Sequence, residues 1–73
     1  MDTKRLGRRI KAFRKLKGYT QVELAEELEV PIITLGDVER GKQRASNELL
    51  EQIAVTLSIS KQEILAGETV HEE

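Results

Sequence analysis

Apolar residues recur every three or four positions along most of this chain, and charged residues fill the positions between them. That spacing places the apolar residues on one side of a helix with 3.6 residues per turn. No run of β-branched residues alternates with polar ones, and no Asn-Gly or Asp-Gly pair marks a hairpin. The pattern therefore predicts an all-α chain with five helices.

The first predicted helix runs from about residue 3 to Lys17. Its apolar side consists of Leu6, Ile10, Phe13 and Leu16. Gly18 follows directly. Glycine is the usual residue just beyond a helix end, because it adopts the left-handed backbone conformation without strain, so we expect the helix to stop there.

A capping box opens the second predicted helix, in the segment TQVELAEEL. The Thr20 hydroxyl is expected to accept a hydrogen bond from the backbone N–H of Glu23, whose carboxylate reaches back to the backbone of Thr20. The side of this helix that faces the core then consists of Leu24, Ala25 and Leu28.

A third helix is expected after the connection formed by Glu29 and Val30. Pro31 suits its first position, because the N–H that proline lacks would be unpaired there anyway. The helix should end near Arg40, with Gly41 closing it. Its inward side is predicted to consist of Leu35 and Val38.

Two serines mark the starts of the last two predicted helices. Ser46 is the expected N-cap of the fourth, and Ser60 with Glu63 forms a second capping box before the fifth. The apolar stripe of the fourth helix consists of Leu49, Leu50, Ile53, Ala54 and Leu57. The fifth is short, passes through Ile64 and Leu65, and should end at Gly67.

The last six residues, ETVHEE, have no helical periodicity and are mostly ionisable. We therefore predict one domain over residues 1–67, followed by a flexible tail over residues 68–73.

Charge is unevenly distributed, although the net charge is only −1. Residues 1–18 carry eight basic residues and one acidic residue, whereas residues 19–73 carry four basic and twelve acidic residues. One interpretation is that a basic helix is attracted to acidic helices within the fold. The other is a surface for a polyanion, which requires Lys42 and Arg44 to share a face with the cations nearer the N-terminus.

The residue inventory argues against an enzyme. The chain has no cysteine, and its one histidine, His71, lies in the acidic tail, so we expect no metal site and no disulfide. No glycine-rich phosphate loop is present, and no histidine or lysine is placed to activate a serine or threonine. We therefore expect no catalysis, no cofactor and no small-molecule substrate. With no long apolar run for a membrane span or signal peptide, a cytoplasmic location is expected.

Two segments carry a resemblance to a known family. They are RKLKGYTQVELAEELEVPIITLGDVERGK at residues 14–42 and SNELLEQIAVTLSISKQEIL at residues 46–65. The first resembles the helix-turn-helix of the lambda-repressor-like family, of the Cro/C1 or XRE type, and the second resembles that family's last two helices. The resemblance implies a compact five-helix domain whose third helix enters the DNA major groove. It also implies a bacterial or phage-type transcriptional regulator that binds double-stranded DNA specifically or with weak specificity, as a homodimer formed in solution or on the DNA.

The resemblance assigns roles to particular residues. Gln21 stands where the family contacts a DNA phosphate from the start of the second helix, assisted by the positive helix terminus. In the loop after the third helix, Lys42, Gln43 and Arg44 resemble a second set of phosphate contacts. Arg14 and Glu39 occupy positions that form a structural salt bridge in the family.

The third helix departs from the family pattern. Its base-facing positions are Ile32, Ile33, Thr34, Gly36 and Asp37. Relatives usually carry Gln, Arg, Ser, Asn or Lys there. Isoleucine can pack on a thymine methyl group, threonine can hydrogen-bond weakly, and aspartate can accept from a cytosine amino group but is repelled by phosphates.

Two other interpretations of these isoleucines stay open at this point. Ile32 and Ile33, beside Gly36, could form a small apolar surface that docks a protein partner, as in an antitoxin-like or regulator-docking module. Alternatively, Ile33 turns inward and enlarges the core.

Overall fold

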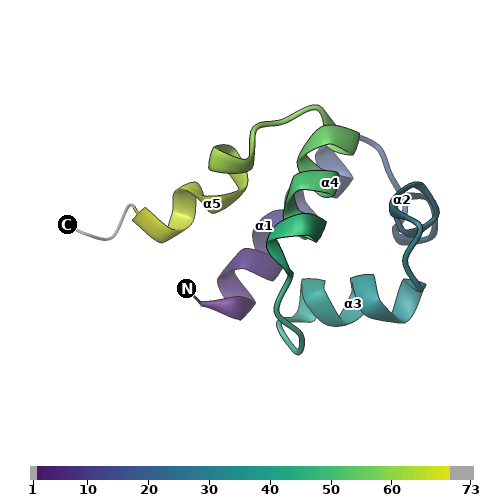
Figure 1. The fold of residues 1–73 in the computed structure, drawn as a ribbon, viewed down its shortest axis with the longest axis horizontal. Coiled ribbons are helices and arrows are strands. Elements are labelled where there is room, and N and C mark those ends of the chain that lie inside the picture. The colour runs from purple at the N-terminus through teal and green to yellow at the C-terminus, as the bar shows by residue number, and fades with distance from the viewer. Residues whose placement is uncertain (1, 70–73) are drawn as a thin grey trace.

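The computed structural model describes the backbone of residues 2–69 and the side chains of residues 2–65, and that part of the chain folds into five helices (Figure 1). They are α1 (Thr3–Leu16), α2 (Gln21–Leu28), α3 (Ile32–Arg40), α4 (Asn47–Leu57) and α5 (Lys61–Thr69). The all-α prediction is confirmed. None of these described helices is long and apolar enough to cross a membrane.

Each helix packs against others that are distant in sequence. Helix α1 contacts α3 and α5, α2 contacts α3 and α4, and α4 contacts α5. In Figure 1, α3 runs along the lower edge, α2 is viewed nearly end-on at the right, and α4 crosses in front of α1. The second and third helices therefore form one corner of the domain, with the outer side of α3 facing away from the other helices.

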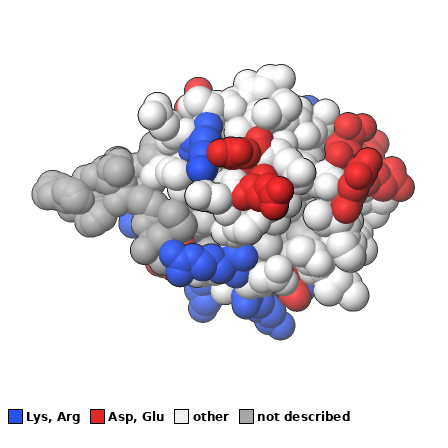
Figure 2. Space-filling model, in the orientation of Figure 1, with Lys and Arg blue, Asp and Glu red and all other residues white. Residues whose placement is uncertain are grey.

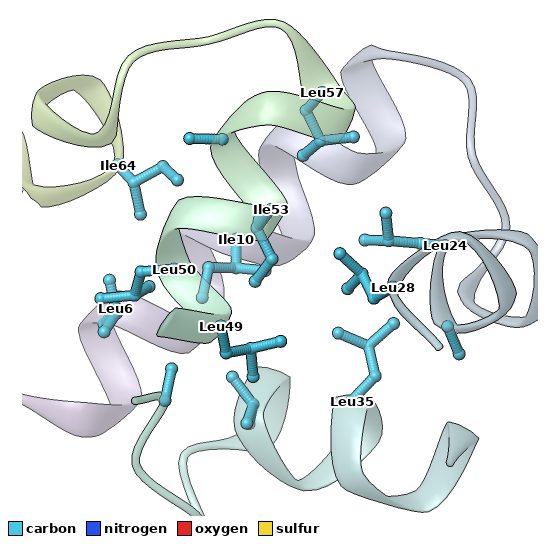
Figure 3. Close-up of a cluster of buried hydrophobic side chains, with 14 residues drawn as sticks. Leu6, Ile10, Leu24, Leu28, Leu35, Leu49, Leu50, Ile53, Leu57 and Ile64 are labelled. Atoms are coloured by element: carbon cyan, nitrogen blue, oxygen red, sulfur yellow. The ribbon is translucent and has the colours of Figure 1, made fainter. Parts of the chain in front are cut away.

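The core draws on all five helices (Figure 3). Its most completely buried side chains are Leu6, Ile10, Leu24, Leu35, Val38, Ile53, Leu57 and Ile64. The expectation that Leu16 belongs to this core is wrong, because its exposed fraction is 75%. The inward face of α1 continues from Ile10 to Arg14, and Leu16 lies about 200° around the helix from Arg14.

Local side-chain hydrogen bonds cap the starts of α1, α2, α4 and α5. Thr20 and Glu23 form the predicted capping box, with hydrogen bonds of 3.0 and 2.9 Å. The hydroxyl groups of Ser46 and Ser60 accept backbone hydrogen bonds from the third residue beyond each, at 3.1 and 3.0 Å. Asp2, which the sequence analysis missed, caps α1 by accepting from the backbone N–H of Lys4 at 3.0 Å.

Helix ends differ from prediction at two places. Pro31 is the extended N-cap residue of α3, so the helix begins at Ile32 and not at the proline. Helix α5 continues through Gly67 to Thr69, since a glycine inside a helix costs only about 1 kcal/mol and does not end it. Glu68 and Thr69 thus belong to a helix, and the rest of the predicted tail, including His71, lies outside the described residues.

Helix α5 is held to α1 by Arg9. Its guanidinium donates hydrogen bonds to the carbonyl oxygens of Glu63 at 2.6 Å and Ile64 at 3.0 Å. The same group lies 5.5 Å from the centre of the Phe13 ring. A cation over an aromatic face is attracted to it, so Arg9 contributes to the α1–α5 packing in two ways.

A glycine allows α1 and α3 to approach closely. A Cβ atom at Gly7 would overlap the carbonyl oxygen of Val38 and lie 2.6 Å from that of Glu39. The backbone of α1 therefore touches the last turn of α3 directly. This contact fixes where the end of α3, and the loop after it, lie relative to α1.

Replacing Gly7 with alanine should lower the free energy of unfolding by about 2–3 kcal/mol, because two backbone segments must separate to admit the methyl group. Gly36→Ala is the matched control, because its Cβ would meet only the end of the long Arg40 side chain, 3.2 Å away at Nη1, and no backbone atom of another helix. Alanine also favours the helix by about 1 kcal/mol over glycine, so the control should be neutral or stabilising. Urea unfolding followed by circular dichroism measures both, and equal losses would contradict the close-approach role of Gly7.

Candidate nucleic-acid interface

The turn between α2 and α3 sets the direction of α3. Glu29 adopts the left-handed conformation (φ 58°, ψ 42°) at the end of α2, and Val30 donates its backbone N–H to the carbonyl of Ala25 at 3.1 Å. Val30 then packs against the core, and the extended Pro31 leads into α3. The result is a helix-turn-helix unit joined by a three-residue turn.

Arg14 and Glu39 form a buried ion pair between α1 and α3. The Arg14 Nε lies 2.7 Å from Glu39 Oε2, and Nη2 lies 3.1 Å from Oε1, so the pair is bidentate. The two side chains are only 8% and 2% exposed. The ion pair that the family resemblance implies is therefore present in the structure.

The ion pair extends into a network that the sequence analysis missed. Gln21, the first residue of α2, donates its side-chain amide to Glu39 Oε1 at 3.0 Å. Arg14 also donates to the carbonyl oxygen of Tyr19 at 3.0 Å, just before α2. Glu39 therefore links α1, the start of α2 and the end of α3. Nothing in local sequence spacing indicates the contact between Gln21 and Glu39, which are 18 residues apart.

The outer side of α3 begins with two exposed isoleucines. Ile32 is 43% exposed and Ile33 is 71% exposed. The alternative in which Ile33 enlarges the core is therefore wrong. Leu35 is fully buried, and Ile33 lies two residues earlier, about 200° around the helix, so its side chain points outward.

The other end of this face differs from the sequence-based expectation. Gly36 is buried and not open to solvent, because the guanidinium of Arg40 lies over it. Arg40 is held there by Asp37, whose Oδ1 accepts a hydrogen bond from Nη2 at 2.8 Å. The expectation that Asp37 is a free acceptor is therefore wrong. Opposite charges three residues apart on a helix, as at Asp37 and Arg40, are a pattern in the sequence that indicates such a pair. The charge of Asp37 is thus offset by an adjacent, 58% exposed cation.

Beyond α3, the loop residues Lys42, Gln43 and Arg44 are all exposed. The backbone N–H groups of Lys42 and Gln43 donate to the carbonyl oxygen of Asp37, at 2.8 and 3.3 Å, and tie the loop to the last turn of α3. Lys42 lines a groove together with cations of α1, whereas Arg44 lies on a different groove beside Thr34 and Gln43. Lys42 thus shares a face with the cations nearer the N-terminus, as the polyanion interpretation of the sequence requires, whereas Arg44 does not line that groove.

Opposite charges are partly separated on the face drawn in Figure 2. Lys and Arg side chains lie along its lower edge, near the start of α1 and the loop after α3, whereas Asp and Glu side chains lie at the right, over α2, and at the centre, beside a basic side chain. Among the described side chains, Arg14 is the one basic residue of 1–18 that forms an ion pair with an acid of 19–65. Direct ion pairs with those described acids therefore neutralise only one of the eight basic residues of this segment.

This geometry agrees with what comparison with known proteins finds. Residues 10–64 match the helix-turn-helix family. The chain belongs to this family. The predicted resemblance to its XRE-type members, which rested on residues 14–65, is confirmed.

Relatives of this helix-turn-helix protein include regulators of similar length. YazB of Bacillus subtilis, named an uncharacterized HTH-type transcriptional regulator, is 43% identical over 68 residues, which cover 93% of this chain and 99% of YazB. The crystal structure of the clp gene regulator ClgR from Corynebacterium glutamicum is 34% identical, with a TM-score of 0.87 over 96% of this chain and 78% of that one. The structure of SinR, the master regulator for biofilm formation, in complex with DNA is 39% identical, with a TM-score of 0.77 over 82% of this chain and 97% of that one.

Proposed function

We propose that this protein binds double-stranded DNA as a transcriptional regulator, with α3 in the major groove. The observation that carries the proposal is the exposed outer face at the start of α3, in a helix whose end contacts Gln21 through Glu39 and leads into the exposed loop of residues 42–44. The SinR structure supports it, because a related fold is in complex with DNA there. The names of the relatives describe transcriptional regulators and lend no support to a protein-docking or antitoxin-like role for Ile32 and Ile33. We place this activity in the cytoplasm, where a regulator of this kind meets its DNA.

In this proposal the phosphate contacts and the base contacts come from different elements. Gln21, Lys42, Gln43 and Arg44 contact phosphates and set the orientation of the domain. The buried pair of Arg14 and Glu39 joins α1 to α3, and the hydrogen bond from Gln21 to Glu39 ties the start of α2 to the same carboxylate. A domain this small makes few contacts, so useful affinity requires two copies on half-sites about one helical turn, roughly 34 Å, apart.

The composition of the α3 face favours apolar reading of the bases. Ile32 and Ile33 are the exposed side chains at its N-terminal end, and they can pack on thymine methyl groups. The Asp37 carboxylate already accepts a hydrogen bond from Arg40 and is less available to a cytosine amino group. We therefore propose that apolar contacts with thymine methyl groups contribute more to the sequence preference of this protein than hydrogen bonds to base edges do.

The experiment that tests the function removes the two cations of the loop. Lys42→Gln with Arg44→Gln should weaken binding to a duplex of roughly 21 base pairs, two helical turns. For each bound copy, the slope of log affinity against log salt should become shallower by about 2 units, since each phosphate contact contributes about 0.9. Fluorescence anisotropy at several salt concentrations measures both quantities.

Lys15→Gln with Lys17→Gln is the control for this experiment. It changes the net charge by the same amount at exposed positions near the end of α1, away from the loop after α3. The control slope should stay within about half a unit of the wild-type slope. If both double variants lose the same slope, the loop makes no defined phosphate contacts, and the proposed placement of DNA is wrong.

A further inference from the structure

A groove between α1 and the end of α3 gathers cations that the proposed DNA contacts leave mostly unused. It has a volume of about 690 Å³ and is open to solvent. Its basic side chains are Lys4, Arg8, Lys11, Arg40 and Lys42. Of these, only Lys42 belongs to the phosphate contacts proposed above.

The α1 cations of the groove share one helix face. Lys4, Arg8 and Lys11 are spaced by four and three residues, which places them in a row along α1. Seven residues of helix extend about 10 Å, comparable to the axial rise of three nucleotides in one DNA strand at about 3.4 Å each. All three side chains are exposed.

A close contact joins this row to the loop after α3. A Cβ atom at Gly41 would lie 2.5 Å from Cγ of Lys4 and 2.7 Å from its Cα. Gly41 has a φ of +81°, a left-handed conformation that glycine adopts without strain. Because glycine has no Cβ, it also leaves room for the close approach of Lys4. Lys4 is thus seated beside the residue that precedes Lys42, and the cations of the two elements form one continuous surface.

The acids near the groove are already occupied. Glu39, which also lines the groove, is buried and paired with Arg14, and Asp37 is paired with Arg40. Within the described part of the chain, no ion pair involves Lys4, Arg8, Lys11 or Lys42. Four like charges around one groove repel each other. A polyanion that binds there neutralises these charges and relieves their repulsion, which favours its binding.

We propose that this groove is a second phosphate-binding surface, which holds the DNA backbone beyond the phosphates contacted by the loop after α3. The proposal rests on the proposed DNA binding, and Lys42 is the residue shared by the two surfaces. Duplex DNA fits better than a single strand, because Phe13 and Tyr19, the aromatic residues of the chain, are both partly buried against the core and neither lines the groove. The surface also gives a role to the positive charge of residues 1–18. Ion pairs among the described side chains neutralise little of that charge.

Two triple variants of equal charge test this proposal. The groove variant is Lys4→Gln, Arg8→Gln and Lys11→Gln. The control variant is Arg5→Gln, Lys15→Gln and Lys17→Gln, three exposed cations that do not line the groove. Affinity for a duplex is measured between about 50 and 200 mM salt, and thermal unfolding of each variant checks that the domain is folded.

For each bound copy, the groove variant should lose about 2 to 3 units of salt slope on a duplex with flanking base pairs on both sides of the bound site. The control variant should lose less than about 1 unit. On a duplex trimmed to the bound site, the wild type and the groove variant should converge, because the flanking phosphates are absent.

Equal losses in the two triple variants would overturn the groove, since net charge alone would then explain them. It would also be overturned by a groove variant that loses single-stranded RNA binding and keeps duplex binding. The proposed DNA function fails separately, through the Lys42 and Arg44 pair. If the Lys42→Gln, Arg44→Gln double variant loses salt slope and the groove variant loses none, the proposed DNA binding is supported and the groove proposal is refuted.

Discussion

Arg14→Met is expected to lower the free energy of unfolding by about 3–5 kcal/mol, because it leaves the Glu39 carboxylate buried without its cation. Glu39 is 4% exposed, and Gln21 remains as its only other donor among the described contacts. Methionine keeps most of the apolar volume of the arginine stem, so the loss reports the stranded charge more than lost packing. Urea unfolding followed by circular dichroism measures it.

The double variant Arg14→Met with Glu39→Met should recover most of that loss. Two apolar side chains of similar volume replace a buried ion pair at little cost, and no unpaired charge remains. If the single variant is unfolded, the recovered helical signal of the double variant is the measured quantity. A double variant as unstable as the sum of the two single variants would mean that the stranded charge is not the source of the loss.

The same double variant separates folding from function. Gln21 loses its acceptor on Glu39 in that protein, although the helices should be packed as before. If Gln21 needs this hydrogen bond to reach a phosphate, DNA affinity falls while stability is largely restored. The ion pair then holds a DNA contact in place in addition to joining α1 to α3.

Features that depend on neighbouring residues were predictable from the sequence. The capping box of Thr20 and Glu23 and the helix-closing Gly41 are made by residues within a few positions of one another. The buried positions of α4 follow from one uninterrupted apolar stripe. The pairing of Arg14 with Glu39 is not local, and it came from the resemblance to a family of known architecture.

Features that depend on distant contacts or on side-chain conformation were missed. Gly7 reads as an unremarkable helical glycine until the carbonyl of Val38, 31 residues later, is placed against it. Gly36 was expected to be open, but the side chain of Arg40 folds back over it. Leu16 follows the apolar spacing of α1, but the residue of that turn that faces the core is Arg14. Arg14 can be buried because its ion-pair partner, Glu39, lies on α3.

The exposure of Ile33 allows a test in which stability and DNA affinity move in opposite directions. Helix α3 has no acidic residue in its first turn, and Ile33 lies within that turn with an exposed fraction of 71%. Ile33→Glu places a negative charge near the positive helix terminus without emptying the core. The free energy of unfolding should therefore rise by about 0.3–1 kcal/mol.

DNA affinity of the Ile33→Glu protein should fall about a hundredfold, close to 2.7 kcal/mol, because a carboxylate is then held between two strands of phosphates. The loss should shrink as salt is raised, since screening weakens the repulsion.

Val55→Glu is the matched control: Val55 is 78% exposed on α4 and gains the same charge away from the α3 face. Its DNA affinity should stay within about threefold of the wild type, allowing for the one-unit change in net charge. Anisotropy titrations and urea unfolding on the same preparations give both quantities. If Ile33→Glu binds duplex DNA as well as Val55→Glu does, the N-terminal half of α3 does not enter the major groove.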